Sequence, residues 1–545
     1  MRFILSLIFL FSYFIGIAQN KYDVSAPINL PRTGVNKVLS MKNGNTMLFH
    51  FEPTKDISVV IFDSLHKEIA NTKVSTRILD LYIIADAEFK GMYEINGEGV
   101  LFFDQAHLGK HRLIRVSINA QNGVLTDEKL VAESPSANKR TLFFVMKDKS
   151  DDGYAILFST DIPQFRDCKV SLIYYSYKHE QLKEIPIDVA RKKYDYMYIV
   201  HAESQSNGIS ISLCLSSLLE NGTAHGVFSA APVYEHYLAM YYIPKNSQSL
   251  MSTGAKLLND THPLYTNYSY NPFAQSLNLL VLSYYEVAYQ NGLQWLPGAL
   301  LQHIFFKVDE NNMGVSYKWI RNKSASDLLK QKGDTSAFYE GIPLTVFTNE
   351  NGLSTMVSES FSKYSEPETY ARNNKYTYLG HIGITQFDDD GNELWGTVLP
   401  MKQRYISHRN YYPAYELSKK WQSQMLFADL PEAVYERQFV SINSYCHDKN
   451  YYIIFNDDNK NFNNSIEKPG DTVYTFENTN ACYYKMNRKK EITKQYVFGE
   501  PASGEYKCSF AEGADFDEKR GVYVSLVQYK KGEDVSLRMA WSHLD

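Results

Sequence analysis

One unit, a strand followed by a polar turn and a second strand, recurs along almost the whole chain. Its strands are short runs of β-branched and aromatic residues, such as residues 59–62 and 304–307. The turns begin near Asp63, Asn119, Ser176, Pro244, Asp309, Asp388 and Asn487. Because a repeat of this length decides the architecture of a long β chain, each unit predicts one structural module.

Each module is expected to hold about four strands. A further hairpin precedes most of the turns, as in residues 37–41 with 47–51, and residues 439–445 with 451–455. Four-stranded units repeated around a ring form a β-propeller, in which radial closure removes most exposed sheet edges. The sequence therefore predicts an all-β protein, a β-propeller of seven or eight four-stranded blades.

The two ends of the chain predict how such a ring closes. After the seventh unit, residues 514–517, 522–529 and 535–541 supply only three strands, while residues 22–30 form an extended stretch that belongs to no unit. We therefore expect the N- and C-terminal strands to pair in one shared blade, in addition to seven complete ones. Because the repeat spacing is irregular, seven blades in total is the alternative. Residues 19–545 are expected to form a single domain.

The hairpin around Asp388 carries a recognisable pattern. It reads Phe-Asp-Asp-Asp-Gly-Asn-Glu-Leu-Trp from residue 387 to residue 395. This resembles the Asp-x-x-Gly-x-x-x-Trp hairpin of exported propellers, among them quinone-dependent dehydrogenases. The resemblance to secreted multi-blade β-propeller proteins covers nearly the whole mature chain and implies their architecture. It identifies no named family, because the other turns keep the shape without the Gly or the Trp.

Residues 1–18 predict a cleavable signal peptide. Arg2 gives a positive start, residues 3–17 are mainly apolar, and Gly16 and Ala18 put small residues where a signal peptidase reads. A membrane anchor is the alternative, but the run is shorter than the ~20 residues that a spanning helix needs. No Cys follows the cut, so a lipoprotein is not expected. The mature chain is predicted to be exported, and to be periplasmic or associated with the outer membrane or cell surface.

Charge and cysteine content exclude other classes of protein. Without Arg2, the chain carries 55 Lys and Arg against 61 Asp and Glu, a net charge of −6 that argues against nucleic acid as a partner. Five cysteines are too few for a disulfide-rich scaffold. Cys446 and Cys482 are one possible pair, and buried free thiols are the favoured alternative.

The chain contains none of the familiar catalytic or cofactor motifs. Nucleophile elbows, phosphate-binding loops, His-Glu-x-x-His helices and Cys-x-x-Cys pairs are all missing from the sequence. Residues 388–390 are acidic enough to bind Ca²⁺, but Asp and Asn also stabilise such turns without a metal, which is the favoured interpretation. We therefore predict no cofactor and no metal site.

The region that departs most from the repeat is an insertion at about residues 402–437, with helical periodicity from residue 414 to residue 438. Aromatic side chains stack on sugars or anchor protein partners, and Arg holds carboxylates. The candidate binding residues are Arg404, Tyr405, His408, Arg409, Tyr411, Tyr412, Tyr415 and Trp421. The alternative is that these rings only hold a long loop against the blade beneath it.

Two functions remain open. The favoured one is a non-catalytic exported binding or scaffold protein of the cell envelope, which docks a protein complex or a glycan through its aromatic-rich loops. The alternative is a secreted carbohydrate-active hydrolase with carboxylates near the propeller channel, at the ~5–10 Å separation that such chemistry requires. Two or three convergent carboxylates at the channel mouth would favour the hydrolase, and a broad aromatic surface would favour the binding protein.

Overall fold

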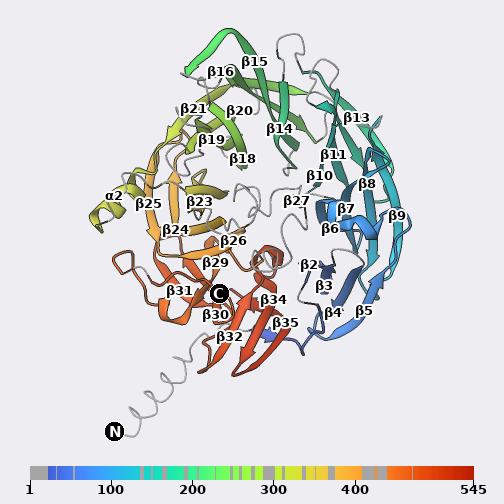
Figure 1. The fold of residues 1–545 in the computed structure, drawn as a ribbon, viewed down its shortest axis with the longest axis vertical. Coiled ribbons are helices and arrows are strands. Elements are labelled where there is room, and N and C mark those ends of the chain that lie inside the picture. Colours follow the sequence, from blue (N-terminus) through green and yellow to red (C-terminus); the bar gives the residue numbers. More distant parts are fainter. Residues whose placement is uncertain are drawn as a thin grey trace.

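The protein is built almost entirely from antiparallel β-strands, which follow one another around a ring (Figure 1). The computed structural model describes residues 22–31, 33–52, 56–135, 140–148, 151–162, 169–189, 194, 196–204, 208–226, 229–245, 250–256, 261–271, 276–285, 301–309, 314–333, 339, 341–349, 351–365, 375–407, 424–425, 438–468 and 470–544. The predicted signal peptide lies outside these residues and stays a prediction.

Seven blades are each built from four strands that are consecutive in the chain. Blade 1 consists of β2 (Val35–Ser40), β3 (Thr46–Phe51), β4 (Ile57–Phe62) and β5 (Glu68–Val74), and blade 2 of β6 (Glu88–Ile95), β7 (Glu98–His107), β8 (Lys110–Asn119) and β9 (Leu125–Glu133). Blade 3 consists of β10 (Arg140–Lys147), β11 (Tyr154–Ile162), β12 (Lys169–Tyr175) and β13 (Gln181–Ile187), and blade 4 of β14 (Tyr196–Ser204), β15 (Gly208–Gly226), β16 (Ser229–Pro244) and β17 (Met251–Lys256). Blade 5 consists of β18 (Thr261–Asn271), β19 (Ser276–Tyr285), β20 (Leu301–Asp309) and β21 (Val315–Ile320). Blade 6 consists of β22 (Gly341–Thr348), β23 (Ser354–Ser365), β24 (Lys375–Phe387) and β25 (Glu393–Leu399). Blade 7 consists of β28 (Asn443–His447), β29 (Asn450–Asp458), β30 (Thr479–Met486) and β31 (Ile492–Tyr496).

An eighth sheet joins the two ends of the chain. Its strands run in the order β1 (Tyr22–Val24), β35 (Asp534–His543), β34 (Val522–Lys531) and β32 (Glu505–Ser509), and the short β33 (Asp515–Asp517) also pairs with β34. Tyr22 lies opposite Ser542 and Val24 opposite Ala540. The predicted β-propeller of seven complete blades plus one shared by both termini is therefore confirmed, although β32 was not anticipated.

The ring is closed through the first strand of each blade. β2 contacts β6, and the contacts continue in order through β10, β14, β18, β22 and β28, while β2 also touches β33 and β34 of the eighth sheet. Figure 1 shows these first strands nearest the centre and the fourth strands, such as β5 and β9, at the rim. Antiparallel pairing then places the first and third hairpins of every blade on one face, which we call the turn face. The second hairpins and the inter-blade links lie on the opposite face, the link face.

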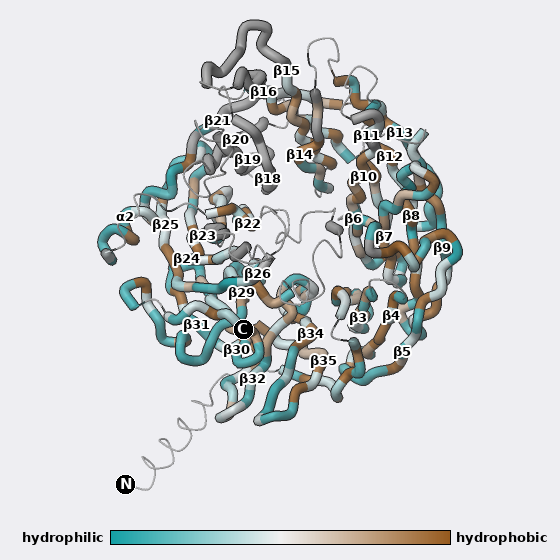
Figure 2. The backbone as a smooth tube through the Cα atoms, viewed as in Figure 1, coloured by the Kyte–Doolittle hydropathy of each residue, from teal (hydrophilic) through white to brown (hydrophobic). Residues whose placement is uncertain are grey.

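Burial explains why the inner strands read as continuous apolar runs and the outer strands alternate. β3 and β4 are buried at every position, because each of their two faces packs against a neighbouring blade. The rim strand β5 is mostly exposed. One core cluster between blades 1 and 2 includes Phe51, whose ring centroid lies 6.0 Å from that of Phe103. Figure 2 shows the same division, with hydrophobic segments inside the sheets and hydrophilic ones at the hairpins.

The repeated turns found in the sequence are the hairpins between the third and fourth strands of the seven blades. Asn119, Asp388 and Asn487 each begin such a hairpin, while Asp309 ends a third strand. The side chain at the first position stabilises the turn: Asp388 Oδ1 accepts hydrogen bonds from the N–H groups of Asp390 (2.9 Å) and Asn392 (2.7 Å). Asp and Asn recur there because their oxygens satisfy backbone donors.

The helix α2 (Lys323–Gln331) packs on β25 at the outside of blade 6 (Figure 1). The insertion is described only in part. β26 (Gln403–Ser407) pairs with β24, and β27 (Gln424–Met425) pairs with β6 on the other side of the ring. The predicted helix over residues 414–438 is therefore wrong at residues 424–425, where the backbone pairs with a strand, and most of it lies outside the described residues.

Two further expectations concern the cysteines and the membrane. Cys446 is exposed, Cys482 is buried, and both are thiols, so the possible disulfide between them does not form. Within the described part of the chain, no helix has the length and apolar character that a membrane crossing would require.

Candidate functional site

The structure places two of the eight candidate binding residues. Arg404 and Tyr405 lie on β26, at the point where the insertion leaves blade 6. The other six, His408, Arg409, Tyr411, Tyr412, Tyr415 and Trp421, lie outside the described residues and stay predictions.

Tyr405 and Arg404 point to different environments, as neighbours on a strand do. The Tyr405 side chain is 2% exposed and belongs to the core cluster formed by blades 6, 7, 8 and 1. Its ring therefore helps to hold the insertion against the propeller, as the alternative interpretation of these aromatic residues proposed. Arg404 is only partly buried, so its side chain reaches the surface.

Arg404 lies among aromatic rings. The register of β24 with β26 places it opposite Tyr378, and its guanidinium carbon is 6.0 Å from the centroid of that ring. The guanidinium is closer to the ring of Tyr474, at 4.1 Å, and Tyr474 is 52% exposed. The backbone N–H of Arg404 donates to the carbonyl of Val473 at 3.0 Å, which fixes the strand beside Tyr474. We call Arg404, Tyr378 and Tyr474 the Arg404 site.

A cavity of about 410 Å³ adjoins the Arg404 site on the link face. It is lined by Ser360, Tyr378, Leu379, Gly380, Lys402, Gln403 and Thr472. Hydroxyl, amide and ammonium groups therefore surround it, with Tyr378 shared between the cavity and the Arg404 site. Such a lining can exchange hydrogen bonds with a polar segment of a ligand or partner.

Behind this cavity lies a buried carboxyl group, Glu359. Gln403 Oε1 accepts a hydrogen bond from the Ser441 N–H at 2.7 Å, and the Ser441 hydroxyl donates to Glu359 Oε2 at 2.8 Å. Glu359 Oε1 has no partner among the described residues, and the side chain lies in the interior. Burial raises the pKa of Glu359 to about 8, against the weaker effect of the Ser441 bond. The group therefore stays protonated at neutral pH. The sequence signal for it was a single acidic residue inside a strand of mainly small, apolar and aromatic residues.

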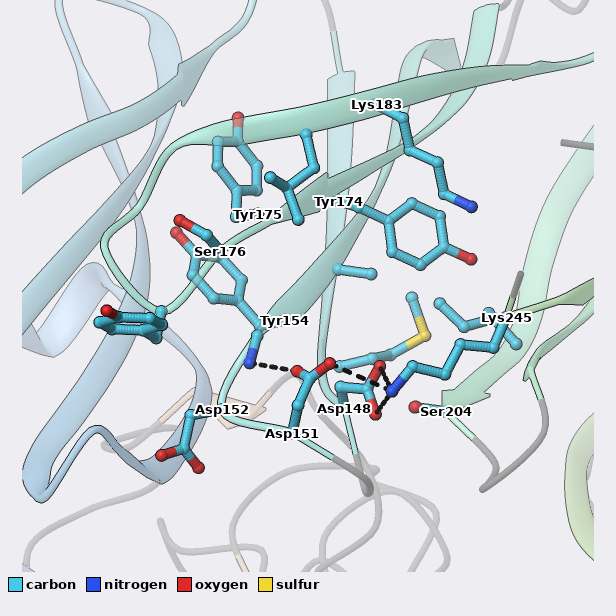
Figure 3. A pocket seen from close by; sticks show the side chains of 16 residues that line it. Asp148, Asp151, Asp152, Tyr154, Tyr174, Tyr175, Ser176, Lys183, Ser204 and Lys245 are labelled. Atoms are coloured by element: carbon cyan, nitrogen blue, oxygen red, sulfur yellow. Dashed lines mark hydrogen bonds and ion pairs between the residues drawn. The ribbon is translucent and has the colours of Figure 1, made fainter. Parts of the chain in front are cut away.

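A second cavity lies on the turn face, between blades 3 and 4 (Figure 3). Its volume is about 550 Å³, and its walls come from the first and third hairpins of blade 3 and the ends of β14, β15 and β16. We call it the tyrosine cleft, because Tyr154, Tyr174, Tyr175 and Tyr177 line it. Sequence reasoning missed this cleft, since its two walls are brought together only by the packing of two blades.

Ion pairs fix the floor of the tyrosine cleft. Lys245 of blade 4 places its Nζ atom 3.1 Å from carboxylate oxygens of both Asp148 and Asp151 (Figure 3). Burial opposes the charge on Lys245, but the bonds to Asp151 and Asp148 outweigh it and raise the pKa of the ammonium group. In the same hairpin, Asp152 is 2.6 Å from Lys42 of blade 1. The carboxylates of the cleft are thus matched by ammonium groups.

Comparison with known proteins finds distant structural neighbours. The sequence matches no known family and no curated protein. Among solved structures, the chain is similar to the WD40 domain of SCAP from fission yeast, at 7% identity and a TM-score of 0.32, over 96% of this chain and 98% of that one. An apocarotenoid oxygenase from Synechocystis gives 9% identity and a TM-score of 0.31 over 70% and 95% of the two chains. A puromycin hydrolase gives 8% and 0.33 over 78% and 50%.

Proposed function

We propose that this chain is an exported, non-catalytic binding protein of the cell envelope, which docks a protein partner or glycan at the Arg404 site and the insertion that follows it. The observation that supports this most is the position of the Arg404 guanidinium, 4.1 Å from the centroid of the Tyr474 ring and beside a polar cavity. A β-propeller provides the rigid ring on which such loops are presented.

The chemistry of the site favours a ligand that carries a carboxylate. A guanidinium held on an aromatic face loses little side-chain entropy on binding, and its planar fork of donors matches a carboxylate. The exposed Tyr474 ring offers apolar area next to that charge. Arg and Tyr are also the residue types that dominate binding energy at interfaces.

Three carboxylates of the described residues are held by ammonium groups. Asp148 and Asp151 share Lys245, and buried Asp457 lies 2.8 Å from Lys494. A glycosidase needs one carboxylic acid and one carboxylate facing the same bond. These three carboxylates instead form ion pairs within the protein.

The proposal is tested by capture followed by titration. The chain from residue 19 to residue 545 is immobilised, incubated with solubilised envelope fractions, and each captured molecule is identified by mass spectrometry. The purified partner is then titrated against wild type and Arg404→Ala. We expect the variant to bind about 10- to 100-fold more weakly, the range for a lost hydrogen bond to a charged group.

The chain offers a matched control. Arg538 also stacks on a tyrosine, with its guanidinium carbon 4.6 Å from the Tyr529 centroid, but it lies in blade 8. Arg538→Ala should leave the affinity unchanged. Replacing Tyr411, Tyr412 and Trp421 together by Ala tests the rest of the insertion in the same titration. Equal binding by wild type and Arg404→Ala, or capture of no partner from the solubilised envelope fractions, would refute the proposal.

A further inference from the structure

The tyrosine cleft has the size and lining of a small-molecule site. Its volume of about 550 Å³ falls within the roughly 300–1,000 Å³ that ligand pockets occupy. Met146, Ala155 and Ile209 contribute apolar surface, while Ser176 and Ser204 contribute hydroxyls. The cleft therefore combines apolar surface with hydroxyl and charged groups that can orient a ligand.

One polar group in this lining has unused hydrogen-bonding capacity. The hydroxyl of Tyr174, on β12, is buried and has no hydrogen-bond partner in the part of the chain that the structure describes. Burial raises the pKa of Tyr174, so the hydroxyl keeps its proton and remains a donor. The Lys183 Nζ atom lies 4.2 Å from the centroid of the Tyr174 ring, and Figure 3 shows the two side chains extending in the same direction. An unsatisfied buried hydroxyl is costly unless something binds it.

The opposite side of the cleft supplies acceptors. Asp148 and Asp151 converge on Lys245, and all three side chains line the same hollow. Asp151 Oδ1 also accepts from the Gly153 N–H at 2.6 Å, and a carboxylate group has about four lone-pair sites in all. The single ammonium group of Lys245 offsets only one of the two carboxylate charges, so the set disfavours an anion and can accept hydrogen bonds from the hydroxyl groups of a ligand.

Stacked rings form one wall of the cleft, and its rim is apolar. Tyr175 stacks between Tyr154 and His179, with ring centroids 5.1 Å and 4.8 Å apart and interplanar angles of 13° and 5°. At the rim, Leu182 is 65% exposed and Tyr177 is 42% exposed. A ligand that enters the cleft would therefore cover apolar surface that water now contacts.

We propose that the tyrosine cleft binds a saccharide. A sugar ring is the ligand class that combines an apolar face of C–H groups with a perimeter of hydroxyls, which both donate and accept. The apolar face would lie on the wall formed by Tyr174 and Leu182. Its hydroxyls would accept from Tyr174 and donate to Asp148 and Asp151.

This inference goes beyond the proposed function and does not depend on it. The cleft lies on the turn face between blades 3 and 4, and it shares no residue with the Arg404 site or with the cavity beside it. Arg404→Ala should therefore leave saccharide binding unchanged. Failure of one proposal is thereby distinguished from failure of the other.

The test is isothermal titration calorimetry of the purified chain with a panel of neutral oligosaccharides built from glucose, galactose, mannose, xylose and N-acetylglucosamine. The sugar that binds is then titrated against Tyr174→Phe and Leu182→Asp. We expect Tyr174→Phe to lower affinity about three- to tenfold, the cost of one neutral hydrogen bond, without lowering the thermal midpoint, because it removes a hydroxyl that has no partner in the protein. Leu182→Asp should weaken binding about tenfold by placing a charge on the apolar rim.

Leu394→Asp is the matched control for the rim variant. Leu182 and Leu394 are each the second residue of the fourth strand of their blade, and Leu394 is 51% exposed. Leu394→Asp should leave saccharide affinity as in wild type. If the whole panel fails to bind, or if the bound sugar is held equally by wild type, Tyr174→Phe and Leu182→Asp, the cleft is not a saccharide site.

Discussion

The blades of this ring are joined in two different ways. Blades 1 to 4 meet on the turn face through ion pairs around a single hairpin, residues 148–153. Asp152 accepts from Lys42 of blade 1 at 2.6 Å and from the Asn96 N–H of blade 2 at 3.2 Å, while Lys245 of blade 4 reaches Asp148. We call this set of contacts the charged junction. Its members are half-exposed, so salt and water reach them.

Blades 6, 7, 8 and 1 are instead joined by buried amide and hydroxyl groups, which we call the neutral junction. The Asn456 side chain donates to the carbonyls of Phe439 (2.8 Å) and Ser509 (2.7 Å), and it accepts from the Ser509 N–H (2.8 Å). Gln438 similarly accepts from the Asn36 N–H at 2.9 Å and donates to the Gly34 carbonyl at 3.1 Å. These contacts span chain separations of up to 404 residues.

The two junctions differ in how much stability the protein loses when one contact is broken. An exposed ion pair that breaks is hydrated and screened, so it contributes little to stability. A buried amide that is removed leaves backbone groups without water or protein partners, which costs the full desolvation of each. The neutral junction should therefore account for most of the stability of ring closure, and the charged junction should mainly fix the shape of the tyrosine cleft.

The largest effect is expected from Asn456→Ala. It leaves two carbonyls and one N–H unsatisfied in the interior, which should lower the free energy of unfolding by about 3 to 5 kcal/mol. Urea unfolding followed by circular dichroism measures this. Asn351→Ala, at an exposed position in the hairpin between β22 and β23, should change it by less than about 0.5 kcal/mol. A loss below 1 kcal/mol in Asn456→Ala would refute the assigned role of the neutral junction.

A pH dependence follows from Glu359, which belongs to the neutral junction only while it is protonated. Its pKa in the folded state is raised to about 8 from an ordinary value of 4.5, so the folded state binds more protons than the unfolded state between these values. Stability should therefore fall as pH rises from about 4.5 to about 8. Glu359→Gln, which stays neutral, should remove at least about 2 kcal/mol of this decline, since one pKa unit corresponds to about 1.4 kcal/mol.

The measurement is urea unfolding at pH 5 and at pH 8.5. Glu68→Gln, an exposed substitution on β5, is the control and should decline with pH as wild type does. If wild type and Glu359→Gln decline equally, Glu359 is ionised in the folded protein and the junction is not neutral.

The smallest effect is expected from Asp152→Asn in the charged junction. Burial opposes the charge of Asp152, but Lys42 outweighs it and lowers the pKa of the carboxyl group. The variant should lose about 1 kcal/mol at low ionic strength, and most of that difference should vanish in 1 M NaCl. Asp56→Asn is the control for an ion pair that joins no blades, because its ion pair with Lys73 lies within blade 1. A loss that persists in high salt would mean that the junction does not act through charge.

The parts of the fold that could be predicted from the sequence are those determined by residues close together in the chain. Asp388 and Asn487 recur at hairpins because their side-chain oxygens bond to the backbone a few residues on, so the repeat could be read from residue types. Pairing of the chain ends followed from counting strands. In the insertion, helical periodicity predicted the wrong structure at residues 424–425, because pairing with β6 overrides local preference.

The candidate sites were harder to predict, for the same physical reason. Arg404 was identified because basic and aromatic residues cluster near it in the sequence. Its stacking on Tyr474 could not be predicted, because Tyr474 arrives from a different blade. In the tyrosine cleft, Asp148 and Lys245 are 97 residues apart. Contacts of this kind depend on blade order and register, which residue types alone do not encode.

The pairing of β1 with β35 has a consequence for the making of the protein. Tyr22 of β1 pairs with Ser542 of β35, 520 residues later in the chain. Blades 1 to 7 each contain four consecutive strands that can pair locally, but β1 keeps unpaired backbone groups until β35 is available. Unpaired sheet edges of this kind promote aggregation. Ring closure therefore protects the backbone of β1 only after all the blades between β1 and β35 are in place.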